Sequence, residues 1–223
     1  QLGLSAQTER RTRRIILNDD GGIRFPGDGK NWDHYLNQRV RLAAGTQTDS
    51  YFVCVSATSL GPAELPALAS TMSQWSAHGK ISSPFDQAAR RIIKTARGNG
   101  WEVFASIRMN DSHDRGRSGA KDLHYPFKLK RPDLLLGNAR SLQMGARAYP
   151  EGSVMHWFWA GFDWKKTGVQ QHFLQFIRWY CSRYDFDGLE LDYYPHPLFF
   201  KPGEEVAGLP QMTEFVRQNT AAP

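Results

Sequence analysis

Cysteine is scarce in this sequence, with two residues, Cys54 and Cys181, in a chain of 223. Cys54 lies in an apolar run and Cys181 lies on the apolar stripe of an expected helix. Their separation is not one that metal ligands use, so a cysteine-ligated metal is not expected. Both side chains are predicted to belong to the core.

Long apolar runs are also missing from the sequence. No stretch approaches the roughly 20 apolar residues that a membrane-spanning helix needs, so no membrane partner is expected. No signal peptide precedes Gln1, but a mature secreted chain also begins without one. A secreted or periplasmic location is compatible with the sequence, which does not otherwise specify where the protein acts.

No nucleic-acid recognition motif accompanies the formal net charge of +6. The arginines are scattered except for the run Arg10, Arg11, Arg13 and Arg14, so a nucleic-acid partner is not expected. A polyanionic glycan would be attracted by the same positive field.

The composition, with 40% hydrophobic and 13% aromatic residues, is typical of one globular domain. Residues 1–13 are polar and basic and are predicted to form an N-terminal tail. Residues 14–223 then form the folded domain, which is long enough to bury a substantial core.

Strand-like and helix-like patterns alternate along this domain. Ser83 and Pro84, for example, are a typical helix start, with a capping side chain followed by proline at the first helical position. Strands are expected at residues 15–17, 51–57, 101–110 and 187–194, and helices at residues 32–40, 83–96, 169–180 and 212–216. The alternation predicts an α/β fold with a parallel sheet and right-handed crossovers, either doubly wound or a barrel.

Loop lengths indicate which edge of this sheet carries function. Connections from helix to strand are short, whereas the segments that follow the second and third strands are long and polar. Ligands of such folds bind at the carboxyl ends of the strands, so these loops are predicted to surround a site. The alternative is that they are surface insertions without function.

The fourth expected strand, DGLELDYY, carries two carboxylates on one face. Residues two apart in a strand share a face, so Glu190 and Asp192 point together while Leu189 and Leu191 point towards the helices. Repulsion between nearby carboxylates favours one protonated group beside an ionised one, which suits acid/base hydrolysis. A purely structural alternative is an ion pair with an arginine of a neighbouring strand.

A second polar cluster lies at the carboxyl end of the third strand and in the loop that follows, and it is unusually dense for a turn. An arginine there would lie beside the fourth-strand carboxylates, and the amide and imidazole groups could hold sugar hydroxyls. Turn and cap chemistry is the alternative for each residue. The cluster consists of Arg108, Asn110, Asp111, His113 and Asp114. A metal site built from Asp111, His113, Asp114 and His196 is a further alternative, although its spacing fits no recognised pattern.

Aromatic residues are concentrated near the same predicted edge. Sugar rings stack their C–H faces on such side chains, while many aromatics serve only the core. Trp157, Trp159 and Tyr193 are the candidates for contact with a sugar, among the neighbours Trp164, Tyr194, Phe199 and Phe200.

The stretches RMNDSHD and YDFDGLELDYYPHPLFFK, with FDW between them, resemble a group of bacterial glycoside hydrolase-like TIM-barrel proteins. The resemblance extends from Ile15 to Arg217 and implies a (β/α)₈ barrel of which this chain supplies about four β/α units. It implies as site residues Arg108, Asn110, Asp111, His113, Asp114, Glu190, Asp192 and His196.

The fourth strand also resembles the DG-x-D-x-D-x-E strand of chitinase-like barrels, with Asp187, Glu190 and Asp192 in matching positions. Tyr194 stands where that family has its catalytic glutamate, so substrate-assisted chitinase chemistry is not expected.

The length of the chain is short for a barrel, which typically takes about 250 residues. Four β/α units therefore predict the N-terminal half of a barrel, completed either by a missing C-terminal half or by self-association of half-barrels. In retaining barrel hydrolases a second carboxylate comes from a later strand, so the resemblance implies an incomplete site.

The function expected from these features is that of a glycoside hydrolase acting on a polysaccharide or oligosaccharide by carboxylate acid/base chemistry, without a metal or cofactor. Asp192 is the expected proton donor and Glu190 its electrostatic partner, while Arg108, Asn110 and His113 position the substrate. One alternative is a non-catalytic carbohydrate-binding barrel. Another is a metal-assisted hydrolase or a lyase, with Asp19, His113 and His196 as ligands or bases.

Overall fold

A computed structural model describes residues 14–19, 31–56, 84–123, 125–194 and 196–220. The predicted N-terminal tail, residues 1–13, lies outside these ranges. The described residues form an α/β fold with one four-stranded parallel sheet, as the alternating patterns predicted.

The strands and helices follow one another in the order that the sequence predicted, with several short helices added between the third and fourth strands. The strands are β1 (Ile16–Asp19), β2 (Ser50–Ser56), β3 (Glu102–Arg108) and β4 (Gly188–Asp192). The longer helices are α1 (Trp32–Arg39), α3 (Pro84–Gly98), α7 (Thr167–Arg183) and α8 (Glu205–Thr220). The short helices are α4 (Pro126–Lys130), α5 (Ala139–Met144), α6 (Val154–Phe158) and the 3₁₀ turns η1 (Arg41–Ala43), η2 (Gly119–Asp122), η3 (Pro132–Leu134) and η4 (Gly145–Ala148).

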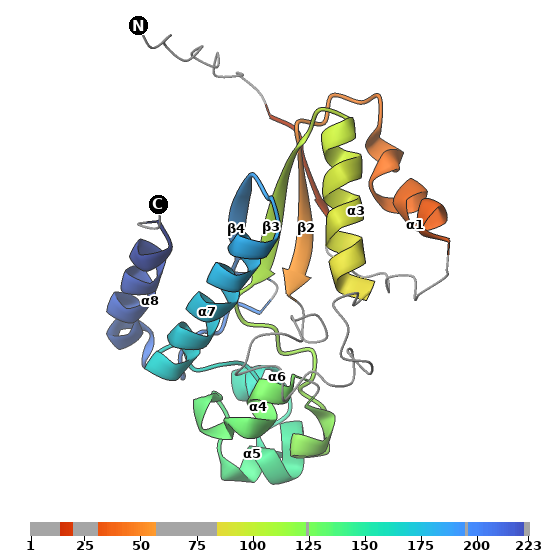
Figure 1. The fold of residues 1–223 in the computed structure, drawn as a ribbon. Helices are drawn as coiled ribbons and strands as arrows, with labels where there is room; N and C mark the ends of the chain where they lie inside the picture. The colour runs from red at the N-terminus through yellow and green to blue at the C-terminus, as the bar shows by residue number, and fades with distance from the viewer. Residues whose placement is uncertain (1–13, 20–30, 57–83, 124, 195, 221–223) are drawn as a thin grey trace, which may run out of the picture.

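The four strands lie side by side in chain order, β1-β2-β3-β4, and each pair is parallel. A doubly wound sheet reverses its strand order at a switch point. The four described strands show no such reversal, and all of their carboxyl ends meet at one edge of the sheet (Figure 1).

One face of the sheet is covered by helices and forms the core. Its strand residues alternate with those of the other face, as the pleat requires. Leu189 and Leu191 of β4 belong to this covered face, as predicted. The core combines Tyr51, Val53, Val103, Ala105 and Ile107 of the strands with Trp32 and Leu36 of α1, Ile92 and Ala96 of α3, and Val169, Phe173 and Ile177 of α7.

The other face carries Asn18, Phe52, Phe104 and Glu190 and is curved. The rings of Phe52 and Phe104 stack with centroids 4.5 Å apart, and Gly188 makes room for Phe104, since a Cβ there would lie 2.3 Å from the ring. Asn18 Nδ2 of β1 donates to Glu190 Oε2 of β4 at 3.3 Å. In a flat sheet those strands would be about 14 Å apart, too far for upright side chains to meet. The sheet is therefore concave on this face.

The long polar segment between β3 and α7 contains α4, α5 and α6 together with three of the 3₁₀ turns. These short helices form a group beyond the carboxyl ends of the strands (Figure 1). Pairing of Leu135 with Phe162 and a capping box between Asn138 and Ser141 help to hold the segment together. The group lies on the edge of the sheet where a site was predicted.

Two details of the helices differ from expectation. Cys54 is buried in β2 as predicted, but Cys181 is exposed, so the prediction that it is a core residue is wrong. Helix α8 also begins earlier than expected and includes Pro210. Phe215 is its most buried contact with the core and packs edge to face against Trp164, with Met212 and Val216 alongside. None of the described helices is long and apolar enough to cross a membrane.

His172 of α7 is a buried polar group in the aromatic part of the core. Its ring stacks on Phe127 with centroids 3.8 Å apart, and the Tyr125 hydroxyl lies 2.8 Å from Nε2. Burial lowers the pKa of His172 from 6.5 to about 4. The imidazole is consequently neutral in the folded protein near pH 7.

Acidification is therefore expected to destabilise the protein through His172. Between pH 6.5 and pH 4 the unfolded chain binds a proton that the folded chain does not, so the free energy of unfolding falls as the pH falls. The difference between the His172 pKa values of the unfolded and folded chain corresponds to a loss of about 3 kcal/mol in the free energy of unfolding. Denaturant titrations across this pH range should show the decline, and the His172→Gln variant should show a shallower one.

His34→Gln is the matched control, because His34 is exposed on α1. It should keep the full pH dependence of the wild type. Equal slopes for the wild type and the His172 variant would contradict the assignment.

Candidate functional site

The candidate site lies where β3 and β4 end. Arg108 and Asp192 are register partners at the last positions of these strands, and the Met109 N–H donates to the Asp192 carbonyl at 2.8 Å. The two following loops therefore start side by side. This arrangement brings the loop after β3 close to His196, whose Nδ1 accepts the Ser112 N–H.

Glu190 and Asp192 lie on the concave face, on the side opposite Leu189 and Leu191, as predicted. Both carboxylates are half-buried. The Glu190 carboxylate accepts the hydrogen bond from Asn18, and Asp192 Oδ1 accepts one from the Tyr194 N–H at 2.9 Å. Each carboxylate is thus held in place and belongs to a residue that is only partly buried.

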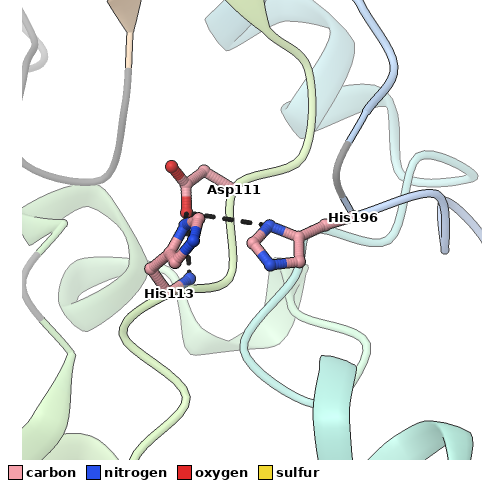
Figure 2. Close-up of side chains that lie close together, drawn as sticks. All are labelled: Asp111, His113 and His196. Carbon is pink, nitrogen blue, oxygen red and sulfur yellow. Dashed lines mark hydrogen bonds and ion pairs between the residues drawn. The ribbon is translucent and has the colours of Figure 1, made fainter. Parts of the chain in front are cut away.

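Asp111, His113 and His196 form a compact cluster beside these strands (Figure 2). Asp111 Oδ1 lies 2.7 Å from His113 Nδ1 and accepts the His113 N–H at 2.9 Å. His196 Nδ1 lies 3.9 Å from the same oxygen, and the two imidazole rings meet edge to face with centroids 4.4 Å apart. The carboxylate orients His113, whose side chain is 53% exposed.

Asp111 is anchored by two cations. Arg108 Nη1 lies 3.3 Å from Asp111 Oδ2, and Lys128 Nζ donates to the Asp111 carbonyl at 2.7 Å. Lys128 also pairs with Asp114 Oδ1 at 2.8 Å, and both of these side chains are almost completely buried. The loop after β3 is consequently fixed by a buried ion pair.

His196 is neutral near pH 7. Burial lowers its pKa to about 4, and the positive charges around it act in the same direction, while the Asp111 carboxylate opposes them. Nδ1 accepts the Ser112 N–H at 3.2 Å, which assigns the proton of the neutral ring to Nε2. Its unprotonated nitrogen thus lies on the side of Asp111.

Three predicted site residues of the loops have structural roles instead. Asn110 donates to the Phe162 and Leu198 carbonyls at 3.0 and 2.6 Å and accepts the Phe162 N–H at 2.7 Å, so its amide is used within the fold. Asp114 is neutralised by Lys128. Trp159 is completely buried and donates to the Arg115 carbonyl at 3.1 Å, so no sugar can stack on it.

Asp19 was expected near the site and lies on the wrong face of β1. It is buried, accepts the Tyr51 hydroxyl and pairs with Arg39 at 3.0 Å. Its neighbour Asn18 points to the concave face instead and contacts Glu190. A shift of one residue in a strand moves the side chain to the other face.

Two predicted aromatic residues remain accessible. Trp157 is 46% exposed, with the Arg115 guanidinium 5.3 Å from its ring centroid. Tyr193 is 37% exposed and packs on Phe199, with its hydroxyl directed at the Met212 sulfur at 3.7 Å. Trp157 lies in α6 and Tyr193 directly follows β4, and each presents an exposed aromatic surface.

Sequence reasoning did not identify Asn18 or Lys128 as contributors. Successive residues of a strand point to opposite faces, and this rule, which predicted the direction of Glu190, also distinguishes Asn18 from Asp19 in β1. Lys128 lies in a stretch, PFKLK, whose pattern gives no sign of a buried charge.

Comparison with protein-family models and with curated proteins found no match to this chain. The chemistry of the site therefore has to be inferred from its geometry.

Proposed function

We propose that this chain is half of a (β/α)₈ barrel that hydrolyses a polysaccharide or oligosaccharide by carboxylate acid/base chemistry, as in the glycoside hydrolase-like barrels that its motifs resemble. One observation carries the proposal. Glu190 and Asp192 share the concave face of a parallel sheet, at the carboxyl edge where barrel enzymes hold their substrates.

Barrel closure is supported by topology and curvature. Right-handed crossovers between strands in unreversed order place every helix on the same face, and α1, α3 and α7 all pack on one face here. The hydrogen bond from Asn18 to Glu190, which joins the first and fourth strands across the other face, supports a bend in that direction. Four further strands would complete the cylinder, from the remainder of a longer protein or from a second copy.

The roles follow from position along β4. Asp192 ends the strand, so it is the group nearest to a glycosidic oxygen that enters from the rim, and it acts as the proton donor. Glu190 lies deeper, held by Asn18, and stabilises positive charge at the sugar ring. His113 binds hydroxyls, the buried Arg108 orients the loop through Asp111, and Trp157 and Tyr193 offer faces for stacking.

Incubating the complete protein with a broad panel of glycans tests this proposal, with released reducing ends as the readout. Hydrolysis of at least one glycan is the expected result. Binding without turnover would replace it with the non-catalytic carbohydrate-binding function, which uses the same aromatic and polar surface. Neither binding nor turnover across neutral, uronate and sulfated glycans would contradict both.

A further inference from the structure

A cluster outside the carboxylate pair has the composition of a metal centre. Asp111 and His113 come from the loop after β3 and His196 from the segment after β4, and one ligand atom from each lies within 4.8 Å of the others (Figure 2). We propose that these three side chains bind a divalent transition-metal ion, with Zn²⁺ as the leading candidate.

The donor types select the class of ion. Two imidazoles and one carboxylate suit Zn²⁺ and its first-row neighbours, whereas Mg²⁺ and Ca²⁺ prefer sites made of oxygen atoms. Three protein ligands also leave a coordination position open for water or a substrate oxygen, as in catalytic zinc sites. An ion held in this way activates water or polarises a carbonyl group.

The distances are close to those that an ion requires. Ligand atoms bonded to one tetrahedral Zn²⁺ at about 2.0 Å are separated by roughly 3.3 Å. The separations of Asp111 Oδ1 from His113 Nδ1 and His196 Nδ1, 2.7 and 3.9 Å, lie on either side of that value. Asp111 Oδ1 therefore already lies within reach of both imidazole nitrogens that would share the ion.

The surrounding contacts direct the three ligand atoms towards one another. Arg108 binds Asp111 through Oδ2, so Oδ1 faces the two imidazoles, and such an outer partner orients a ligating carboxylate. The unprotonated Nδ1 of His196 is turned towards Asp111. When this nitrogen binds the ion, it gives up the hydrogen bond that it accepts from the Ser112 N–H. The His113 Nδ1 proton leaves to solvent when the nitrogen binds the metal.

Asp114 does not belong to this site, although the sequence offered it as a fourth ligand. Lys128 Nζ lies 2.8 Å from its carboxylate, and the pair is buried. The proposed site is therefore a three-ligand site with an open position.

Titration of the purified, tag-free protein with Co²⁺ tests the proposal, because a nitrogen- and oxygen-ligated Co²⁺ of low coordination number has intense visible absorption bands. One Co²⁺ per chain is expected, displaced by Zn²⁺. Loss of an outer-shell partner typically weakens metal affinity by 10- to 100-fold, so loss of a direct ligand should weaken it at least tenfold. Asp111→Asn, His113→Gln and His196→Gln are the ligand variants.

His34→Gln is the control, since this exposed histidine of α1 should leave Co²⁺ affinity unchanged. His113→Gln is the decisive variant, because the His113 side chain is 53% exposed and the substitution leaves the buried core unchanged. No saturable Co²⁺ binding by the wild type, or wild-type affinity in the folded His113 variant, would overturn the proposal. Both readouts are independent of glycan hydrolysis, so they separate this site from the proposed function.

Discussion

Replacing Asp192 by asparagine is expected to lower the rate of glycan hydrolysis by roughly 100- to 10 000-fold, the usual contribution of a positioned general acid. The amide has the same shape as the carboxyl group but cannot deliver a proton. Its oxygen can still accept the Tyr194 N–H, so the end of β4 is preserved. The measurement is kcat and KM on the glycan that the protein hydrolyses fastest.

Two further variants test whether the effect is specific to the carboxylates of β4. Glu190→Gln should also slow hydrolysis, because it removes the negative charge beside the reacting ring while keeping an acceptor for Asn18. Glu205→Gln, on the exposed first turn of α8, should change neither constant. Unchanged kcat in Asp192→Asn would exclude the role of proton donor.

Lys128→Met is expected to lower the free energy of unfolding by about 3–5 kcal/mol, because it leaves the Asp114 carboxylate buried without its counter-ion. Methionine has a similar length and fills the space beside the Phe162 ring, over which the ammonium group lies at 5.5 Å. The loss therefore reports charge and hydrogen bonding more than volume. Equilibrium denaturation by urea measures it.

The same variant should affect the site. Lys128 Nζ also holds the Asp111 carbonyl at 2.7 Å, so its removal loosens the loop that presents His113. Lys121→Met, at an exposed position of η2, should change stability by less than about 0.5 kcal/mol. A double variant that replaces both Lys128 and Asp114 by apolar residues should recover part of the loss. A cost below about 1 kcal/mol for Lys128→Met would contradict a buried, coupled pair.

The elements of the fold could be predicted because their signals are local. Pro84 marked the start of α3, and the placement of Leu189 and Leu191 on the covered face followed from residues two apart sharing a face. Cys181 and Pro210 show the limit of such signals. An apolar stripe on a helix does not specify how far the core extends around that helix, so Cys181 could be misplaced. A proline does not always exclude a helix, and α8 includes Pro210.

The candidate site could be predicted only in part. Glu190, Asp192 and Arg108 lie together because parallel strands end at one edge, which a sequence pattern reveals. Asn110 and Asp114 are residue types that often bind ligands. Here Asn110 donates to the Leu198 carbonyl and Asp114 pairs with the buried Lys128. No local pattern distinguishes a polar group that binds a substrate from one that stabilises a loop.

The sequence by itself determined that the described residues form an α/β fold around four parallel strands, with two carboxylates on one face of the last of them, because periodicity and capping depend on neighbours in the chain. Tertiary structure alone decided that Asn18 and not Asp19 meets Glu190, that Lys128 neutralises Asp114, and that His196 joins Asp111 and His113. These contacts join residues far apart in the chain, and they depend on strand register, sheet curvature and the course of the loops.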